Sequence, residues 1–440
     1  MSSNPSPLRR LLPWIALLYF SEGLPFGIVY DLLPVYFRSA GVSLRDIGLL
    51  SLLGMPWSLK VLWSPLVDRL GERRHWIVGC QIGLAAVLAA LPIFPANEIG
   101  TALRVLLLCL TTFSATQDIA IDAYTIGITP RGAEGPVNSL RVSAYRAALI
   151  VGGGGLVALS GLLGWRVVIS IGAAIFLALA AFSWHAPRET AALERRREFD
   201  ELSKSAPDSS RPLSPLAYAA ARVWSEIVWL FGPLIAWLRR PYAIFVLIFV
   251  LIYKLADASM GPMVKPFWVD RGLTPAEIGL ISTTVGVLAT VLGAIAGGIF
   301  VKRYGIFHGL WVLGLLQALS NLGYAAVAYF DLPRGGIYAA SVVESFTGGL
   351  GTAAFLSFLM HLCDRQHAAV QYALLSALFG LSRSLAGGVS GWGAERLGYA
   401  KYFALTFLLA FPAYALLRWV KTWITDRPAA APSLDSAEGS

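Results

Sequence analysis

The chain has 440 residues, of which 56% are hydrophobic and only 14% are charged. Soluble proteins carry about 25% charged residues, so a water-soluble fold of this size lacks the charges to cover its surface. Lipid is the alternative surrounding. A helix that spans it takes about 20 mostly apolar residues, and with short loops the chain is long enough for about twelve such helices. The composition therefore predicts an all-α polytopic membrane protein with 12 transmembrane helices.

The net charge of +9 does not indicate a nucleic-acid partner, because its placement fits a membrane protein. Lys and Arg gather in the loops of one side, as is typical of cytoplasmic loops. On the opposite side of the first half only Arg38, Arg45 and Arg166 occur. This asymmetry predicts that both termini lie in the cytoplasm.

The chain carries no pattern of a metal site or of an enzyme. Cys80, Cys109 and Cys363 sit in separate apolar runs, too scattered for a disulfide framework. The histidines have no metal-ligand spacing, and the H-E-x-x-H, Walker A and G-x-S-x-G patterns are absent. We expect no cofactor and no enzymatic activity. Any transport must then draw on an ion gradient or on the substrate's own gradient.

Apolar runs bounded by charges, Gly and Pro give two sets of six predicted spans. The first set lies at 12–37, 45–66, 75–95, 101–126, 137–162 and 165–184. The second set lies at 241–268, 275–300, 306–330, 335–361, 368–393 and 400–424. The predicted domains are a cytoplasmic N-terminus (1–11), a first half (12–184), a cytoplasmic linker (185–240), a second half (241–424) and a cytoplasmic tail (425–440).

The linker differs in composition from the spans on either side. Residues 188–215 are charged and rich in Ser and Pro, and residues 216–238 interleave Trp224, Trp229 and Trp237 with charged side chains. The second stretch is long enough to cross, but a thirteenth crossing would invert the second half. We therefore favour a helix that lies in the membrane interface over one that spans.

The chain contains an internal repeat. Residues 37–50 (FRSAGVSLRDIGLL) match residues 268–281 (WVDRGLTPAEIGLI), with Gly41 aligned to Gly272 and Gly48 to Gly279. An even number of predicted helices separates the two copies, so both have the same orientation in the membrane. Two parallel, pseudo-symmetric six-helix halves resemble the architecture of the major facilitator superfamily.

The loop after the second span supports this resemblance. It reads SPLVDRLGERR (residues 64–74), and that superfamily has Gly, Asp-Arg and Gly followed by basic residues at this place. The matching residues are Asp68, Arg69, Gly71, Arg73 and Arg74, whereas Ser64 departs at the leading Gly. Any cytoplasmic loop is basic, but this spacing favours a gating loop that latches the two halves through ion pairs.

Ionisable side chains inside the spans are the candidate site, because lipid tolerates them only where they face a cavity or a partner. In a facilitator fold the first, fourth, seventh and tenth helices line the central cavity. Here these helices carry Glu22, Asp118, Asp122, Lys254, Asp257 and Glu344. The second, fifth and eleventh helices add Lys60, Arg141, Arg146 and Arg383. We predict that these groups contact substrate or protons.

Asp118 and Asp122 are four residues apart, which places them on one helical face about 6 Å from each other. Two carboxylates this close in a low dielectric cannot both ionise cheaply, so the pair suits a proton carrier. Alternatively, each carboxylate pairs with Arg141 or Arg146 and holds two helices together. Lys254 and Asp257, three residues apart, likewise form either a functional pair or a local one that neutralises itself.

Aromatic side chains near these charges have two interpretations. Trp57, Trp63, Phe267 and Trp268 have the flat apolar faces on which sugar rings stack. Trp and other aromatic residues are also frequent at both membrane–water interfaces, where they anchor the helices. The second interpretation explains most of these positions from the sequence.

Several blocks of the chain resemble the AmpG-type muropeptide permeases. In the first half they are FSEGLPFG (20–27), SLKVLWSPLVDR (58–69) and FSATQDIAIDAY (113–124). In the second half they are YKLADA (253–258), LGLLQALSN (313–321), FTGGLGTAAF (346–355) and QYALLSAL (371–378). Only the termini and the central linker lie outside this resemblance. The chain is shorter than the larger members of that family, which carry further apolar segments.

The resemblance implies a proton-coupled importer in the bacterial cytoplasmic (inner) membrane. Its expected substrates are anhydromuropeptides, in which GlcNAc and 1,6-anhydro-N-acetylmuramic acid carry a stem peptide, taken from periplasm to cytoplasm for cell-wall recycling. In organisms with inducible β-lactamase it also implies a role in supplying the inducer. Gln117, Asp118 and Asp122 fall in the fourth-helix block and inherit its suspected role in substrate and proton handling.

Two other function classes stay open at this point. The eukaryotic acetyl-CoA transporters resemble the same blocks more distantly, so another anionic solute is an alternative substrate. A membrane sensor or assembly factor that transports nothing is the third possibility. Charges on all four cavity-lining helices argue against it.

Overall fold

The computed structural model describes residues 7–69, 72–129, 133–187, 241–363 and 368–425. Within these ranges every regular element is helical. The proposed interfacial helix at 216–238, most of the linker and the C-terminal tail lie outside the described residues. So do the first six residues and the loop positions 70–71.

The described part of the first half contains six consecutive helical segments, and four of them include short π-helical or 3-10 turns (η). The first segment comprises α1 Pro7–Gly27, η1 Ile28–Leu32 and α2 Leu33–Ser39. The second comprises α3 Leu44–Leu49, η2 Leu50–Gly54, α4 Met55–Leu59, η3 Lys60–Leu62 and α5 Ser64–Arg69. The third segment is α6 Arg73–Ala90 with η4 Leu91–Ile93, and the fourth is α7 Thr101–Ile128. The fifth comprises α8 Glu134–Leu149, η5 Ile150–Gly155 and α9 Leu156–Leu163, and the sixth is α10 Trp165–Trp184.

The second half repeats this order. Its first three segments are α13 Ala243–Ile252 with α14 Leu255–Asp270, then α15 Pro275–Glu277 with η6 Ile278–Val285 and α16 Gly286–His308, then η7 Gly309–Leu313 with α17 Gly314–Tyr329. The remaining elements are α18 Arg334–Leu362, α19 Ala368–Leu408 and α20 Phe411–Thr425.

The described residues fit the twelve expected spans. Among the described residues, nine helical stretches are long and apolar enough to cross a membrane, and two of these, 275–329 and 371–424, are longer than one crossing requires. Each of the two contains one glycine with a positive φ, Gly305 (85°) or Gly398 (72°), where the helix turns back. The second span, residues 44–69, is broken into short helices and is absent from the nine.

The internal repeat is confirmed in the backbone. Gly41 and Gly272, which the repeat aligns, both have positive φ (89° and 68°), a conformation that favours glycine. Two residues later the next helix of each copy is capped in the same way: Ser43 accepts from the amide of Asp46, and Thr274 from that of Glu277. The two copies therefore make the same turn at the start of the second span of each half.

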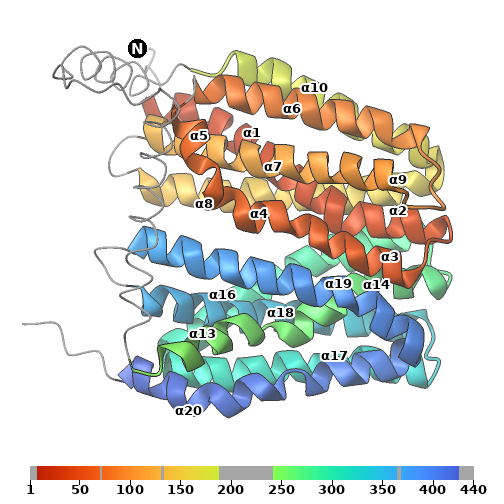
Figure 1. Ribbon diagram of the computed structural model, residues 1–440, viewed down its shortest axis with the longest axis vertical. Coiled ribbons are helices and arrows are strands. Elements are labelled where there is room, and N and C mark those ends of the chain that lie inside the picture. Colours follow the sequence, from red (N-terminus) through yellow and green to blue (C-terminus); the bar gives the residue numbers. More distant parts are fainter. Residues whose placement is uncertain (1–6, 70–71, 130–132, 188–240, 364–367, 426–440) are drawn as a thin grey trace, which may run out of the picture.

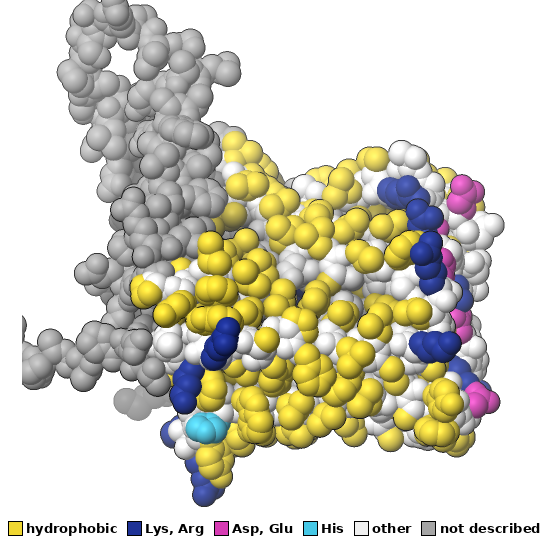
Figure 2. Space-filling view, turned by 60° about the horizontal axis from the view of Figure 1, so that its bottom comes forward, with side chains coloured by type: hydrophobic (Ala, Val, Ile, Leu, Met, Phe, Trp, Pro, Cys, Tyr) yellow, Lys and Arg dark blue, Asp and Glu magenta, His cyan; other side chains and the backbone are white. Residues whose placement is uncertain are grey.

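The two halves form two layers of roughly parallel helices (Figure 1). Helices α1–α10 make one layer and α13–α20 the other. On the face shown in Figure 2, hydrophobic side chains cover the middle. Lys, Arg, Asp and Glu gather along the right edge, and further Lys and Arg side chains lie with a His at the lower left. An apolar middle with a charged rim is the surface that a bilayer requires.

The halves are packed together mainly at one end, which we call the joined end and which contains the turns 40–43 and 271–274. Here α3, η2 and α4 lie against α19, and η5 and α9 lie against α15 and η6. Glycines make the approach close: a Cβ on Gly48 would lie 2.6 Å from the Gly391 nitrogen, and one on Gly279 would lie 2.2 Å from the Gly154 oxygen. Small residues at helix crossings allow such backbone contact.

Candidate functional site

Asp118 lies in the interior of the first half, on α7. Its Oδ2 atom is 3.5 Å from Nζ of Lys60, which comes from η3 of the second span. The other carboxylate oxygen, Oδ1, is buried without a hydrogen-bond partner in the described part of the chain. Buried charged groups normally collect several hydrogen bonds, so one long contact holds this carboxylate weakly for its depth.

Asp122, one turn further along α7, is held by two strong hydrogen bonds. Arg141 Nη2 donates to its Oδ1 atom at 2.6 Å, and the Tyr19 hydroxyl donates to the same oxygen at 2.7 Å. The Arg141 guanidinium also lies over the Tyr19 ring, 4.4 Å from its centroid. Within the described structure Arg146 pairs with neither Asp122 nor Asp118. The two carboxylates are thus neighbours with different partners.

Glu22 on α1 completes this first-half cluster. It lies within electrostatic range of Asp118 and Lys60, and its Oε2 atom is buried with no partner among the described residues. Gln117, by contrast, is fully buried and donates from Nε2 to the Ser21 hydroxyl at 3.1 Å. Gln117 therefore packs α7 against α1 inside the first half.

The second half has its own cluster around Lys254. Its Nζ atom lies 3.4 Å from Oδ2 of Asp257, and it donates to Gln317 Oε1 at 2.5 Å and to Thr352 Oγ1 at 3.1 Å. Glu344 on α18 is within electrostatic range of both Lys254 and Asp257. Lys254 thus ties the seventh span to the ninth and tenth in addition to its contact with Asp257.

Between the two clusters, Arg383 of α19 reaches from the second half to the first. Its guanidinium lies over Phe26 and Tyr30, 5.6 Å and 5.0 Å from the ring centroids. Phe26 and Tyr30 are also in contact with Trp57 of α4. This contact joins the first, second and eleventh spans across the boundary.

The gating-loop motif lies only partly within the described residues. Nothing is described of Gly71 or of the side chains of Asp68 and Arg69. Arg73 donates to the Ala123 carbonyl at 3.0 Å, and Arg74 donates to the Ala186 carbonyl at 3.2 Å. Both of these contacts stay within the first half, and the latch between halves stays a prediction.

Two ion pairs across the boundary were not foreseen from the sequence. Arg38 makes a two-pronged bond to Asp270, with distances of 2.6 Å and 2.7 Å, and the Tyr399 hydroxyl donates to the same carboxylate. Deeper in, Lys265 Nζ lies 3.1 Å from Oδ1 of Asp31. Asp31 and Lys265 fall inside predicted spans, so the rule that singled out Glu22 applied to them as well. Both residues belong to the joined end.

Two of the four aromatic candidates are buried in the core. Trp268 is fully buried and Phe267 is 2% exposed, so neither presents a face to a solute. Trp63 is placed elsewhere, on the flank of the first half. Only Trp57 lies beside the boundary between the halves, in contact with Phe26 and Tyr30.

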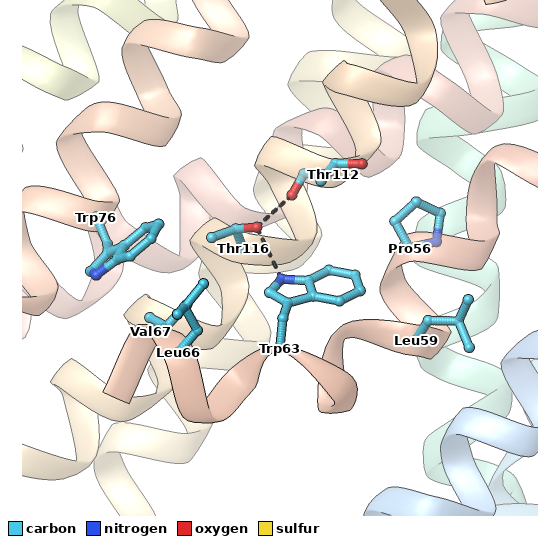
Figure 3. A pocket seen from close by; sticks show the side chains of 8 residues that line it. All are labelled: Pro56, Leu59, Trp63, Leu66, Val67, Trp76, Thr112 and Thr116. Carbon is cyan, nitrogen blue, oxygen red and sulfur yellow. Dashed lines mark hydrogen bonds between the residues drawn. The ribbon is translucent and has the colours of Figure 1, made fainter. Parts of the chain in front are cut away.

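A pocket of about 320 Å³ lies on that flank, between the second, third and fourth spans (Figure 3). The Trp63 indole donates to Thr116 Oγ1 at 3.1 Å, and Thr116 donates to the Thr112 carbonyl at 2.8 Å. The rest of its described lining is apolar, as a surface that faces lipid requires, and none of the charged candidates whose side chains the structure describes lines it. It is therefore separate from the charged clusters.

With this geometry in place, the chain can be compared with known proteins. The family model of the Major Facilitator Superfamily matches residues 15–386. The chain belongs to the major facilitator superfamily. It is 31% identical to the anhydromuropeptide permease of Escherichia coli K12, over 92% of this chain and 78% of that protein. It is 27% identical to a putative transporter AmpG 4 of Rickettsia conorii, over 93% of this chain and 96% of that protein.

The resemblance to the AmpG-type permeases is thereby confirmed, and the protein is a multi-pass membrane transporter. Solved structures agree on the fold. A bacterial homologue of the human lysosomal transporter Spinster, inward-facing and unoccupied, has a TM-score of 0.70 at 15% identity, over 98% of this chain and all of that one. The nucleoside transporter NupG has a TM-score of 0.68 at 17% identity, over 95% of this chain and 100% of that one.

Proposed function

We propose that this protein imports anhydromuropeptides from the periplasm to the cytoplasm by symport with protons. It does so in the bacterial inner membrane, with both termini in the cytoplasm. The relatives named above support the substrate class, and the distribution of Lys and Arg supports the orientation. In this orientation the joined end faces the periplasm, so the structure corresponds to a state closed on that side.

The observation that carries proton coupling is the position of Asp118. Its carboxylate is buried, has one weak contact to Lys60 and leaves one oxygen without a partner. Such a group exchanges a proton with a moderate change of environment, whereas Asp122 is tied to Arg141 and Tyr19. We assign Asp118 as the proton-carrying carboxylate, Glu22 as its neighbour in the relay, and Asp122 as a structural anchor.

Uptake into proteoliposomes tests this function. The purified protein is reconstituted, and labelled GlcNAc–anhydroMurNAc–tripeptide is offered with and without an inward proton gradient. We expect accumulation above the equilibrium level that a protonophore abolishes. Accumulation that is unchanged by the protonophore would exclude proton coupling. Uptake of an acyl-CoA or another anionic metabolite, without uptake of the muropeptide, would exclude the proposed substrate class.

A further inference from the structure

Four aromatic side chains of the first half form a continuous surface beside the boundary, which we call the aromatic shelf: Phe26, Tyr30, Trp57 and Tyr145. The centroid of the Phe26 ring lies 4.4 Å from that of Tyr30, 5.6 Å from Trp57 and 6.3 Å from Tyr145. All four are half-buried, so part of each side chain remains accessible. They come from the first, second and fifth spans, so the shelf depends on the packing of three helices.

Arg383 faces this shelf from the other half. It lies in the middle of the eleventh span, yet its side chain is exposed, and the described residues offer it no ion pair. A guanidinium at this depth is costly in lipid and must face water or a partner. Its guanidinium lies over aromatic rings of the opposite half, so we infer that its exposed part faces the boundary between the halves.

The chemistry of this pairing selects for one kind of solute. An aromatic face gives a large apolar contact to the flat side of a pyranose ring. A guanidinium stacked on an aromatic ring keeps its N–H edge free to donate two parallel hydrogen bonds to a carboxylate. A solute that carries both a sugar ring and a carboxylate satisfies both at once.

We propose that the aromatic shelf and Arg383 form a binding subsite for one pyranose ring and a carboxylate of the transported solute. This rests on the proposed function for the solute's identity, and it is separate from the proton-carrying role of Asp118. The shelf belongs to the first half and Arg383 to the second. A bound solute therefore contacts both halves.

Binding to the purified protein tests the subsite without relying on transport. The probes are GlcNAc–anhydroMurNAc–tripeptide, whose peptide carboxylates are free, and its fully methylated ester, titrated by calorimetry. We expect Arg383→Gln to weaken binding of the acid by about tenfold or more and to leave the ester within about twofold of wild type. Arg396→Gln is the matched control, because Arg396 is exposed on the same helix and stacks on Trp392 within the second half.

The aromatic part is tested with the same two probes. We expect Trp57→Leu to weaken the acid and the ester equally, by about fivefold or more, and Trp57→Phe to retain most of the affinity because it keeps a ring face. Trp63→Leu is the control, since Trp63 lies in the flank pocket and should change neither affinity. Equal loss of both probes in Arg383→Gln, unchanged binding in Trp57→Leu, or no binding of either probe to wild type would overturn the subsite.

These results separate the subsite from the proposed function. If wild type takes up muropeptide and Arg383→Gln binds both probes as wild type does, the proposed subsite is excluded and the proposed function stands. Binding that depends on Arg383, without muropeptide uptake, would keep the subsite and remove the function. Melting curves of each variant confirm that it is folded before titration.

Discussion

Two carboxylates one helical turn apart show how much a side chain's role depends on its partners. The spacing of Asp118 and Asp122 was readable from the sequence, but their partners were not, because these depend on how α7 packs against three other helices. The sequence offered Arg141 and Arg146 as partners. In the structure Arg141 pairs with Asp122, and Lys60 pairs with Asp118.

Asp122→Asn should destabilise the protein more than Asp118→Asn. It removes a charge-assisted bond from Arg141 and weakens the one from Tyr19, at a cost of about 1–3 kcal/mol. Asp118→Asn loses only a 3.5 Å contact. Thermal melting of both variants in detergent measures this, with wild type as reference. Equal melting temperatures for the two variants would contradict the assignment of Asp122 as the anchor.

At the scale of elements, the joined end is held by ion pairs and by glycine seams, which are lines of contact where glycines of the two halves let the backbones touch. The seam between α3 and α19 leaves no room for a side chain: a Cβ on Gly391 would lie 1.8 Å from the Leu44 carbonyl oxygen. That atom belongs to the main chain and cannot move aside as a flexible side chain would. The seam therefore exists only while the two halves are closed at this end.

Gly391→Ala should shift the protein away from this closed state. Nitroxide labels at Ser39 and Ala276, both exposed at the joined end, report the separation of the halves in a background without the three native cysteines. We expect the distance distribution to move to longer values. Gly298→Ala is the control, because a Cβ there meets nothing within 4 Å. An unchanged distribution in Gly391→Ala would contradict the role of the seam.

The ion pair between Arg38 and Asp270 should bias the same equilibrium. Both side chains are partly exposed, so Arg38→Ala is expected to cost up to about 1 kcal/mol, or about a fivefold change in the population of the closed state. The exchange of the two charges, Arg38→Asp with Asp270→Arg, should restore it. Arg334→Ala is the control, because Arg334 pairs with Glu277 inside the second half. The distance measurement above reads the result, and a closed population in Arg38→Ala equal to wild type would exclude the pair as a clamp.

At the scale of the whole molecule, the spans and the repeat were predictable, and the breaks within spans were not. Apolar length and glycine punctuation gave boundaries within a few residues, for example 165–184, which α10 matches. The breakup of residues 44–69 into short helices, and the π-helical turn at Ile28–Leu32, arise from packing between spans. The same holds for the aromatic shelf, whose members are distant in sequence and meet only when the helices pack.

The orientation of the molecule rests on the distribution of Lys and Arg, and a pair of fusions checks it. A green fluorescent protein fused after residue 440 should fluoresce in bacterial cells, because it folds in the cytoplasm. Alkaline phosphatase at the same place should be inactive, since it matures only in the periplasm. Active phosphatase at that position would reverse the topology and place the joined end in the cytoplasm.

The central claim is that a carboxylate held weakly between charged helices couples proton movement to transport. Purified Asp118→Asn in proteoliposomes tests it most directly, when uptake driven by a proton gradient and exchange of labelled for unlabelled muropeptide are measured in one preparation. We predict that accumulation falls by about tenfold or more while exchange stays within about twofold of wild type, because only the titratable group is lost. Accumulation at the wild-type level in Asp118→Asn would contradict the claim.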